Sequence, residues 1–158
     1  DHGSWTKHTN YEQANRIPLV FVAPGVTQPG RSTRAMAETV DIYPTLVELA
    51  GLPQPDVPQP LDGVSLVPVL RDPAAQVKDH VCHVFPRGQR LGRAIRTSRY
   101  RMVEWKKIGA PADTAEYELY DYESDPLETV NLAADKLEVL EGLKAILARQ
   151  PEAKPPVR

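Results

Sequence analysis

Four short β-like runs in the second half of the chain constrain the fold more than any other feature of the sequence. They cover residues 81–85, 94–97, 100–105 and 116–120 and are separated by Gly, Pro, Ser and Arg. Short runs with turn residues between them are typical of an antiparallel sheet. Ser98 and Arg99 are placed to form a two-residue hairpin turn between the second and third runs. We therefore expect a small antiparallel meander.

An amphipathic helix is expected after the last of these runs. Leu137, Leu140, Leu143 and Leu147 recur at i, i+3, i+6 and i+10 within residues 136–148. This spacing gives a helix one apolar face that can cover a sheet. Gly142 is its weak point, because glycine disfavours a helix interior.

The first half of the chain has a different pattern. Residues 17–23 form an apolar run closed by a Pro-Gly pair, which predicts a buried strand. Helical spacing follows over residues 42–50, with Asp41 as the expected N-cap. A proline-rich stretch over 54–60 should be extended, and a short second helix should follow Ser65.

Composition limits the possible functions. The 158 residues suffice for one domain with a core, or for a large piece of a bigger one. A formal net charge of -2 does not favour binding to nucleic acid or to an anionic membrane. No apolar run approaches the roughly 18 residues of a membrane span, and no signal sequence opens the chain. The single cysteine, Cys82, excludes an internal disulfide.

Lys7 and His8 are the first candidate site residues. They precede the apolar run and are flanked by Trp5 and Tyr11. An ammonium group and an imidazole together could hold a sulfate or phosphate oxygen. The alternative is a solvated surface pair, so local chemistry alone leaves the function of these residues open.

Two further candidates have weaker chemistry. Asp1 and His2 look like metal ligands, but two adjacent residues cannot complete a site for a divalent cation. Cys82 would need a basic neighbour to act as a nucleophile, and the side chain of His83 should point to the opposite face of a strand. We therefore expect no metal site made by this chain alone and a structural role for Cys82.

Arginines are concentrated over residues 87–101, from the end of the first β-like run to the start of the third. Most of them should belong to a solvated hairpin surface, although one or two could reach an acidic substrate. The strongest candidate is Arg87, on the irregular corner that includes Pro86 and Gly88. The six arginines of this stretch are Arg87, Arg90, Arg93, Arg96, Arg99 and Arg101.

Several segments together resemble the C-terminal part of type I sulfatases, in the alkaline phosphatase superfamily. Trp5 to Asn10, with Phe85 to Arg87 and Ile95 to Arg101, are most similar to the iduronate-2-sulfatase group. The matching segments follow the family order and comprise residues 1–12, 16–19, 40–46, 61–66 and 118–121, with Asp125-Pro126 and Asn131-Leu132.

The resemblance implies a calcium-dependent sulfuric ester hydrolase with a formylglycine nucleophile made from a cysteine in a C-x-P-S-R type motif. Cys82 lacks the proline and arginine of that motif, so it is not the nucleophile. The order of Trp5 and Lys7 fits the second half of a D-H-G-W-x-L-G-[DE]-H-G-x-W-x-K motif, which argues against Asp1 and His2 as calcium ligands. The nucleophile and the Ca²⁺ ligands are therefore expected in an N-terminal portion outside this chain.

The resemblance also assigns site residues. Lys7 matches the catalytic lysine that contacts the sulfate, and His8 and Arg87 match positions near the substrate pocket. The implied fold is α/β, with residues 1–75 as the last part of the large sulfatase domain and residues 76–158 as an antiparallel sheet subdomain closed by a helix. The expected partners are the N-terminal portion of the same enzyme and a sulfated small molecule or glycan, such as a glycosaminoglycan. A periplasmic, secreted or lysosomal location is implied, and the chain alone should be inactive.

Two other functions stay open at this point. One is a phosphodiesterase or phosphonate hydrolase of the same superfamily, since tetrahedral anions are bound in similar ways. The other is a non-catalytic module that binds acidic glycans through residues such as Arg87 and Arg93.

Overall fold

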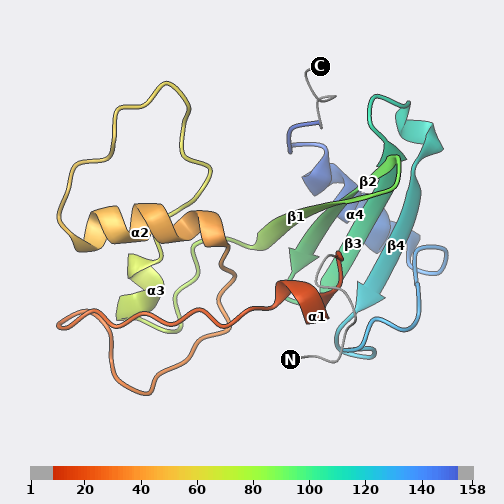
Figure 1. Cartoon of the computed structure of the whole chain (residues 1–158). Coiled ribbons are helices and arrows are strands. Elements are labelled where there is room, and N and C mark those ends of the chain that lie inside the picture. The colour runs from red at the N-terminus through yellow and green to blue at the C-terminus, as the bar shows by residue number, and fades with distance from the viewer. Residues whose placement is uncertain (1–8, 153–158) are drawn as a thin grey trace. The chain divides into compact units, whose positions relative to one another are not determined.

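A computed structural model describes residues 9–152 of the chain and separates them into two compact units (Figure 1). Residues 9–17 and 82–152 belong to one unit, and residues 18–81 form the other. The predicted boundary at residue 75 between the two parts of the chain stays a prediction. None of the helices in the described part is both long and apolar enough to cross a membrane.

An antiparallel sheet organises the first unit. Its strands are β1 (His80–Arg87), β2 (Arg90–Thr97), β3 (Tyr100–Lys107) and β4 (Glu116–Asp121), in the order β1-β2-β3-β4. The predicted meander is therefore confirmed. The strands follow one another in space because each connection is short, and the Ser98-Arg99 turn brings β2 directly beside β3.

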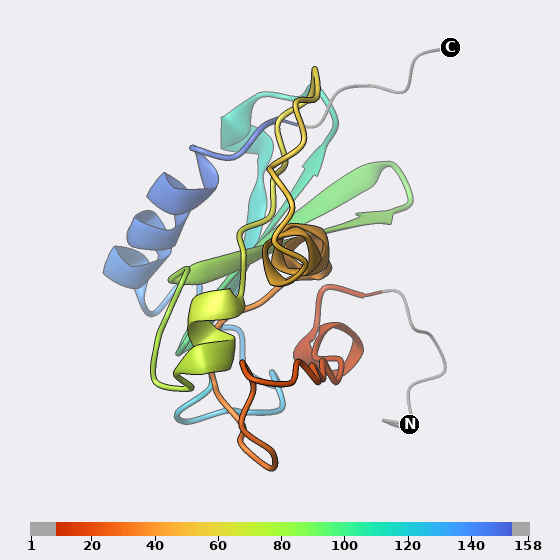
Figure 2. The same ribbon diagram turned by 90° about the vertical axis from the view of Figure 1, so that its left-hand side faces the viewer.

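Helix α4 (Leu137–Leu147) covers one face of the sheet, as Figure 2 shows. Every second side chain of a strand points to the same face, so the sheet contributes an apolar row there. The predicted leucine stripe of α4 faces this row, except for Leu137, which is exposed. The buried core between them consists of Ile95, Met102, Leu119, Leu140, Leu143 and Leu147, with Cys82 packed against it.

The opposite face of the sheet holds a second, smaller core. Ala94, Val103 and Trp105 are buried there, and Phe85 packs against them. Helix α1 (Glu12–Asn15) lies on this side of the sheet, away from α4 (Figures 1 and 2). The sheet therefore has one face covered by α4 and an opposite face that receives the chain from Thr9 onward.

Gly92 allows that second side to pack closely. A Cβ added at Gly92 would lie 2.2 Å from Nδ2 of Asn10 and 2.7 Å from the Trp105 ring. We expect Gly92→Ala to lower the free energy of unfolding by about 1–3 kcal/mol, because overpacking forces neighbouring groups to move. Urea titration followed by tryptophan fluorescence would measure the change.

Gly142→Ala is the matched control for this substitution. The Cβ position at Gly142 in α4 has open space around it. Alanine there should raise stability by about 0.5–1 kcal/mol, since it favours the helix. Equal effects of the two substitutions would contradict the close approach at Gly92.

The second unit is built around Asp41, whose side chain is fully buried. The predicted helices are present as α2 (Ile42–Leu49) and α3 (Val67–Arg71). The Asp41 carboxylate accepts hydrogen bonds from the backbone N–H groups of Glu38, at 2.7 Å, and Val64, at 2.9 Å. It also pairs with Lys78 at 2.7 Å. Asp41 thus lies at the predicted N-cap position of α2, but its side chain makes no capping hydrogen bond to that helix. It ties the start of α2 to the segment before α3 instead.

The strand predicted over residues 17–23 is not formed. These residues lie outside helices and strands, and the side chains of Ile17, Val20 and Val22 are exposed. An apolar run becomes a strand only when a neighbouring strand supplies backbone partners. Within residues 9–152 this run has no such neighbour.

Candidate functional site

The structure describes the chain from the residue that follows the Lys7-His8 pair. Lys7 and His8 themselves, together with Asp1 and His2, lie outside the described residues. The described part of the candidate site therefore consists of the segment that begins at Thr9 and the sheet face that this segment contacts.

Residues 10 and 11 are fixed against the sheet. Asn10 is 1% exposed, and its backbone carbonyl accepts a hydrogen bond from Nη1 of Arg101. Its side-chain amide is buried without a hydrogen-bond partner among the described residues. The ring of Tyr11 meets the ring of Tyr120 edge to face, with centroids 6.0 Å apart.

Glu12 joins two arginines of neighbouring strands. Its Oε2 atom lies 2.6 Å from Nη2 of Arg101 and 3.1 Å from Nε of Arg96. Burial acts to raise the pKa of the Glu12 carboxyl, but hydrogen bonds and charge from the two guanidinium groups outweigh it and hold the pKa below its ordinary value. Glu12 is therefore an ionised carboxylate at neutral pH.

A second carboxylate completes this cluster. Oε1 of Glu128 lies 2.9 Å from Nε of Arg101, and its Oε2 accepts a hydrogen bond of 2.8 Å from the backbone N–H of Glu12. The hydroxyl of Tyr122 donates to Glu128 at 2.5 Å, and the guanidinium of Arg96 stacks on the Tyr122 ring, with Cζ 3.8 Å from its centroid. Two arginines and two glutamates thus balance one another in charge.

His83 reaches the same segment from β1. It forms a hydrogen bond with the backbone of Thr9. Burial, and then the positive charge of Arg101, lower the pKa of His83 below its ordinary value of 6.5. The side chain is therefore neutral when the chain is folded at neutral pH. Sequence reasoning considered His83 only as a neighbour of Cys82.

This lowered pKa predicts how stability depends on pH. The unfolded chain takes up a proton at His83 near its ordinary pKa, whereas the folded chain takes it up only at lower pH. Stability should therefore be full above about pH 6.5 and should fall as the pH drops from 6.5 toward 5. His83→Gln should flatten this slope. Denaturant titrations at pH 5, 6 and 7.5 measure it, and an unchanged slope in the variant would contradict the assignment.

Arg87 lies away from this segment. It is the last residue of β1 and is exposed, four residues beyond His83, or roughly 13 Å along an extended strand. Within residues 9–152 it has no ion pair, whereas the other five arginines of the stretch are paired with carboxylates. The paired ones are Arg90 with Glu116, Arg93 with Glu104, Arg96 and Arg101 with Glu12, and Arg99 with Asp121. Arg87 thus stays available to an acidic ligand, while the other five are largely neutralised.

The described residues do not fit a calcium site. Within 9–152, no group of three or more His, Cys, Asp or Glu side chains is placed to hold a metal ion. The buried carboxylates of this part are already engaged by cations, as Asp41 and Glu128 illustrate.

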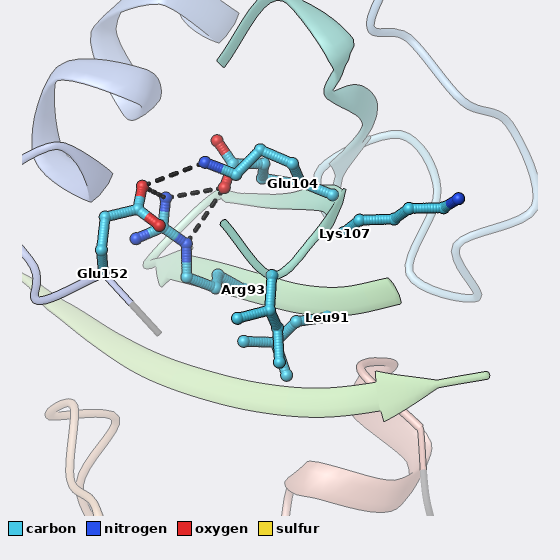
Figure 3. Close-up of a pocket in the computed structure, with 7 residues that line it drawn as sticks. Leu91, Arg93, Glu104, Lys107 and Glu152 are labelled. Atoms are coloured by element: carbon cyan, nitrogen blue, oxygen red, sulfur yellow. Dashed lines mark hydrogen bonds and ion pairs between the residues drawn. The ribbon is translucent and has the colours of Figure 1, made fainter. Parts of the chain in front are cut away.

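A small cavity near the C-terminal end of the described chain is also no substrate site. Its volume is about 10 Å³, enough for one water molecule. Figure 3 shows that Arg93, Glu104 and Glu152 converge there, with Nη2 of Arg93 lying 2.6 Å from Glu104 and 3.0 Å from Glu152. Lys106 is 3.2 Å from Glu152. These ion pairs fill the space that a ligand would need.

Solved structures share this fold. A protein in complex with its substrate D-glucosamine-2-N,6-O-disulfate superposes with a TM-score of 0.65 at 23% identity, over 79% of this chain and 26% of that one. The phosphonate monoester hydrolase of Agrobacterium radiobacter gives a TM-score of 0.57 at 27% identity, over 76% of this chain and 26% of that one. A putative sulfatase from Bacteroides thetaiotaomicron gives a TM-score of 0.55 at 30% identity, over 68% of this chain and 23% of that one, so the fold is the predicted one of a sulfatase subdomain.

Sequence comparison identifies the family. Residues 1–152 match the family described as N-sulphoglucosamine sulphohydrolase, C-terminal, and the chain belongs to it. Arylsulfatase K of Bos taurus is 32% identical over an alignment of 158 positions, which covers 90% of this chain and 27% of that protein. The Delta 4,5-hexuronate-2-O-sulfatase of Bacteroides thetaiotaomicron is 32% identical over 143 residues, with 85% and 28% covered. The chain thus spans about a quarter of the length of these relatives.

Proposed function

We propose that the complete protein containing this chain hydrolyses a sulfate ester of a sulfated sugar. The family match carries this proposal, because it extends over residues 1–152 and includes the Lys7-His8 pair. The docking of the following segment supports it, since Asn10 and Glu12 are held on one sheet face. Such anchoring is what a loop with a site residue requires.

In this proposal Lys7 contacts the sulfate and stabilises the charge that develops in the transition state. His8 and Arg87 contribute to the substrate pocket, and this role is supported by the lack of an ion pair between Arg87 and any residue in the described range 9–152. We place the formylglycine nucleophile and the calcium ligands in the N-terminal portion outside this chain. The chain alone is then inactive, and its partner is that portion of the same enzyme.

For the substrate we propose a 2-O-sulfated uronic acid within a glycosaminoglycan fragment. The resemblance to the iduronate-2-sulfatase group leads to this choice, and the hexuronate-2-O-sulfatase among the relatives supports it. Such a substrate carries a carboxylate in addition to its sulfate, and a guanidinium with no ion pair among the described residues, such as Arg87, can bind it bidentately. A periplasmic, secreted or lysosomal enzyme would meet it.

The likeness to a phosphonate monoester hydrolase favours one second candidate, a phosphonate or phosphodiester hydrolase. Tetrahedral phosphorus and sulfur anions offer similar oxygen geometry to a lysine. Rates on sulfate esters and on phosphonate monoesters distinguish the two reactions.

The complete enzyme should be tested with uronate-2-O-sulfate and glucosamine-6-O-sulfate disaccharides and with phenylphosphonate monoesters. Ion chromatography would follow released sulfate, and alcohol release would follow phosphonate cleavage. We expect the highest kcat/KM on the uronate-2-O-sulfate. A preference for glucosamine-6-O-sulfate would overturn the substrate position, and a preference for phosphonate would overturn the reaction.

A further inference from the structure

Arg96 and Arg101 lie directly opposite each other on β2 and β3. Two like charges at such a position repel each other, so the pair destabilises the sheet unless an anion lies between them. Arg101 is also buried, with 2% of its side chain exposed, so water does not screen its charge. Glu12 supplies this anion, because one of its oxygens reaches both guanidinium groups.

The backbone of Glu12 is held as firmly as its side chain. Its N–H donates to Glu128, which also binds Arg101. Glu128 has a φ angle of 57°, a left-handed conformation that is unfavourable for a residue with a side chain. In this conformation its carboxylate reaches both Glu12 and Arg101.

The anchors lie next to the proposed sulfate-contacting residues in the chain. His83 binds the backbone of Thr9, Arg101 binds the carbonyl of Asn10, and the two glutamates fix residue 12. These contacts begin at the first residue after His8. The sheet thereby fixes the residues that directly follow the Lys7-His8 pair in the chain.

We propose that Glu12, clamped between Arg96 and Arg101, is a positioning residue for the sulfatase reaction: it anchors residues 9–12, which directly follow the Lys7-His8 pair in the chain, and kcat depends on this anchoring. This proposal rests on the role of Lys7 in the proposed function. A displacement of about 1 Å in a group that contacts the transition state can cost on the order of a hundredfold in rate. Glu12 therefore acts on catalysis through the segment it holds, without touching the substrate.

The test uses the complete enzyme with Glu12→Gln, which keeps the size of the side chain and removes its charge. Glu104→Gln is the matched control, because Glu104 is a buried carboxylate paired with an arginine on the face that α4 covers. The readouts are the thermal unfolding midpoint, kcat and KM per folded molecule, and inhibition by inorganic sulfate.

Both variants should unfold at a lower temperature. Only Glu12→Gln should lower kcat, by about tenfold or more, and raise the inhibition constant for inorganic sulfate, because the segment that follows the proposed sulfate-contacting lysine is no longer anchored. Glu104→Gln should keep kcat and KM within about twofold of the parent enzyme. If Glu12→Gln does not fold, Arg96→Gln replaces it and should lower kcat at least about threefold, since one half of the clamp remains.

A kcat within about twofold of the parent for the folded clamp variant would overturn the positioning role. An equal loss in Glu104→Gln would also overturn it, since general destabilisation would then explain the effect. Lys7→Ala, measured in parallel, separates the two levels. A loss in Lys7→Ala without one in Glu12→Gln refutes the clamp alone, whereas normal activity in Lys7→Ala refutes the role of Lys7 and the clamp with it.

Discussion

Replacing Lys7 by alanine in the complete enzyme should reduce kcat for sulfate release by roughly a hundredfold to a thousandfold, the usual loss when one preorganised charge-stabilising group is removed. The ammonium group is proposed to be worth most in the transition state, where negative charge grows on the sulfate oxygens. KM should change much less than kcat, because the interaction strengthens as the reaction proceeds. Initial rates of sulfate release at saturating substrate measure the effect.

Lys107→Ala is the control for this substitution. Lys107 is an exposed lysine at the end of β3, on the surface of the unit that contains the sheet. Its replacement should leave kcat unchanged, because a solvated lysine contributes little to either fold or reaction. A loss in both variants would point to general electrostatic attraction of the substrate, and no loss in Lys7→Ala would remove the lysine from the site.

Replacing Arg101 by glutamine should lower the free energy of unfolding by about 3–5 kcal/mol, because it breaks a buried ion-pair network from one side. Arg101 touches both glutamates of the cluster and the carbonyl of Asn10. Without it Glu128, whose side chain is 3% exposed, keeps its charge in a buried place. Denaturant titration at pH 7 measures the loss.

Arg90→Gln provides the comparison on the neighbouring strand. Arg90 pairs at 2.9 Å with Glu116, a side chain that is largely exposed. Its replacement should cost less than about 1 kcal/mol, as for most surface ion pairs. Equal costs for the two arginines would show that the buried cluster contributes no more than a surface pair.

The sheet subdomain could be predicted from the sequence because its strands, turn and helix are each specified by residues close together in the chain. The spacing of Leu140, Leu143 and Leu147 defines α4, and the turn at Ser98-Arg99 defines the hairpin. That turn also implies that Arg96 and Arg101 lie opposite each other, so the pairing of the two charges could have been deduced. What no local pattern contains is that Glu12, more than eighty residues earlier, neutralises them.

Two other outcomes depended on contacts that the sequence does not specify. Residues 17–23 have the composition of a core strand, but exposed Val20 and Val22 show that composition without neighbouring strands does not make one. From the sequence, His83 had a possible role only as a basic neighbour of Cys82. Its position on the face opposite Cys82 follows from strand alternation, but its contact with Thr9 does not.

The proposed function requires that the complete protein hydrolyses sulfate esters and does not only bind them. The direct measurement is the inorganic sulfate released when the complete protein is incubated with a 2-O-sulfated uronate disaccharide, with binding of the same disaccharide measured in parallel. We expect release over many turnovers and loss of release in Lys7→Ala. Retention of the disaccharide with no sulfate released would contradict the proposed function and would favour an acidic-glycan-binding module.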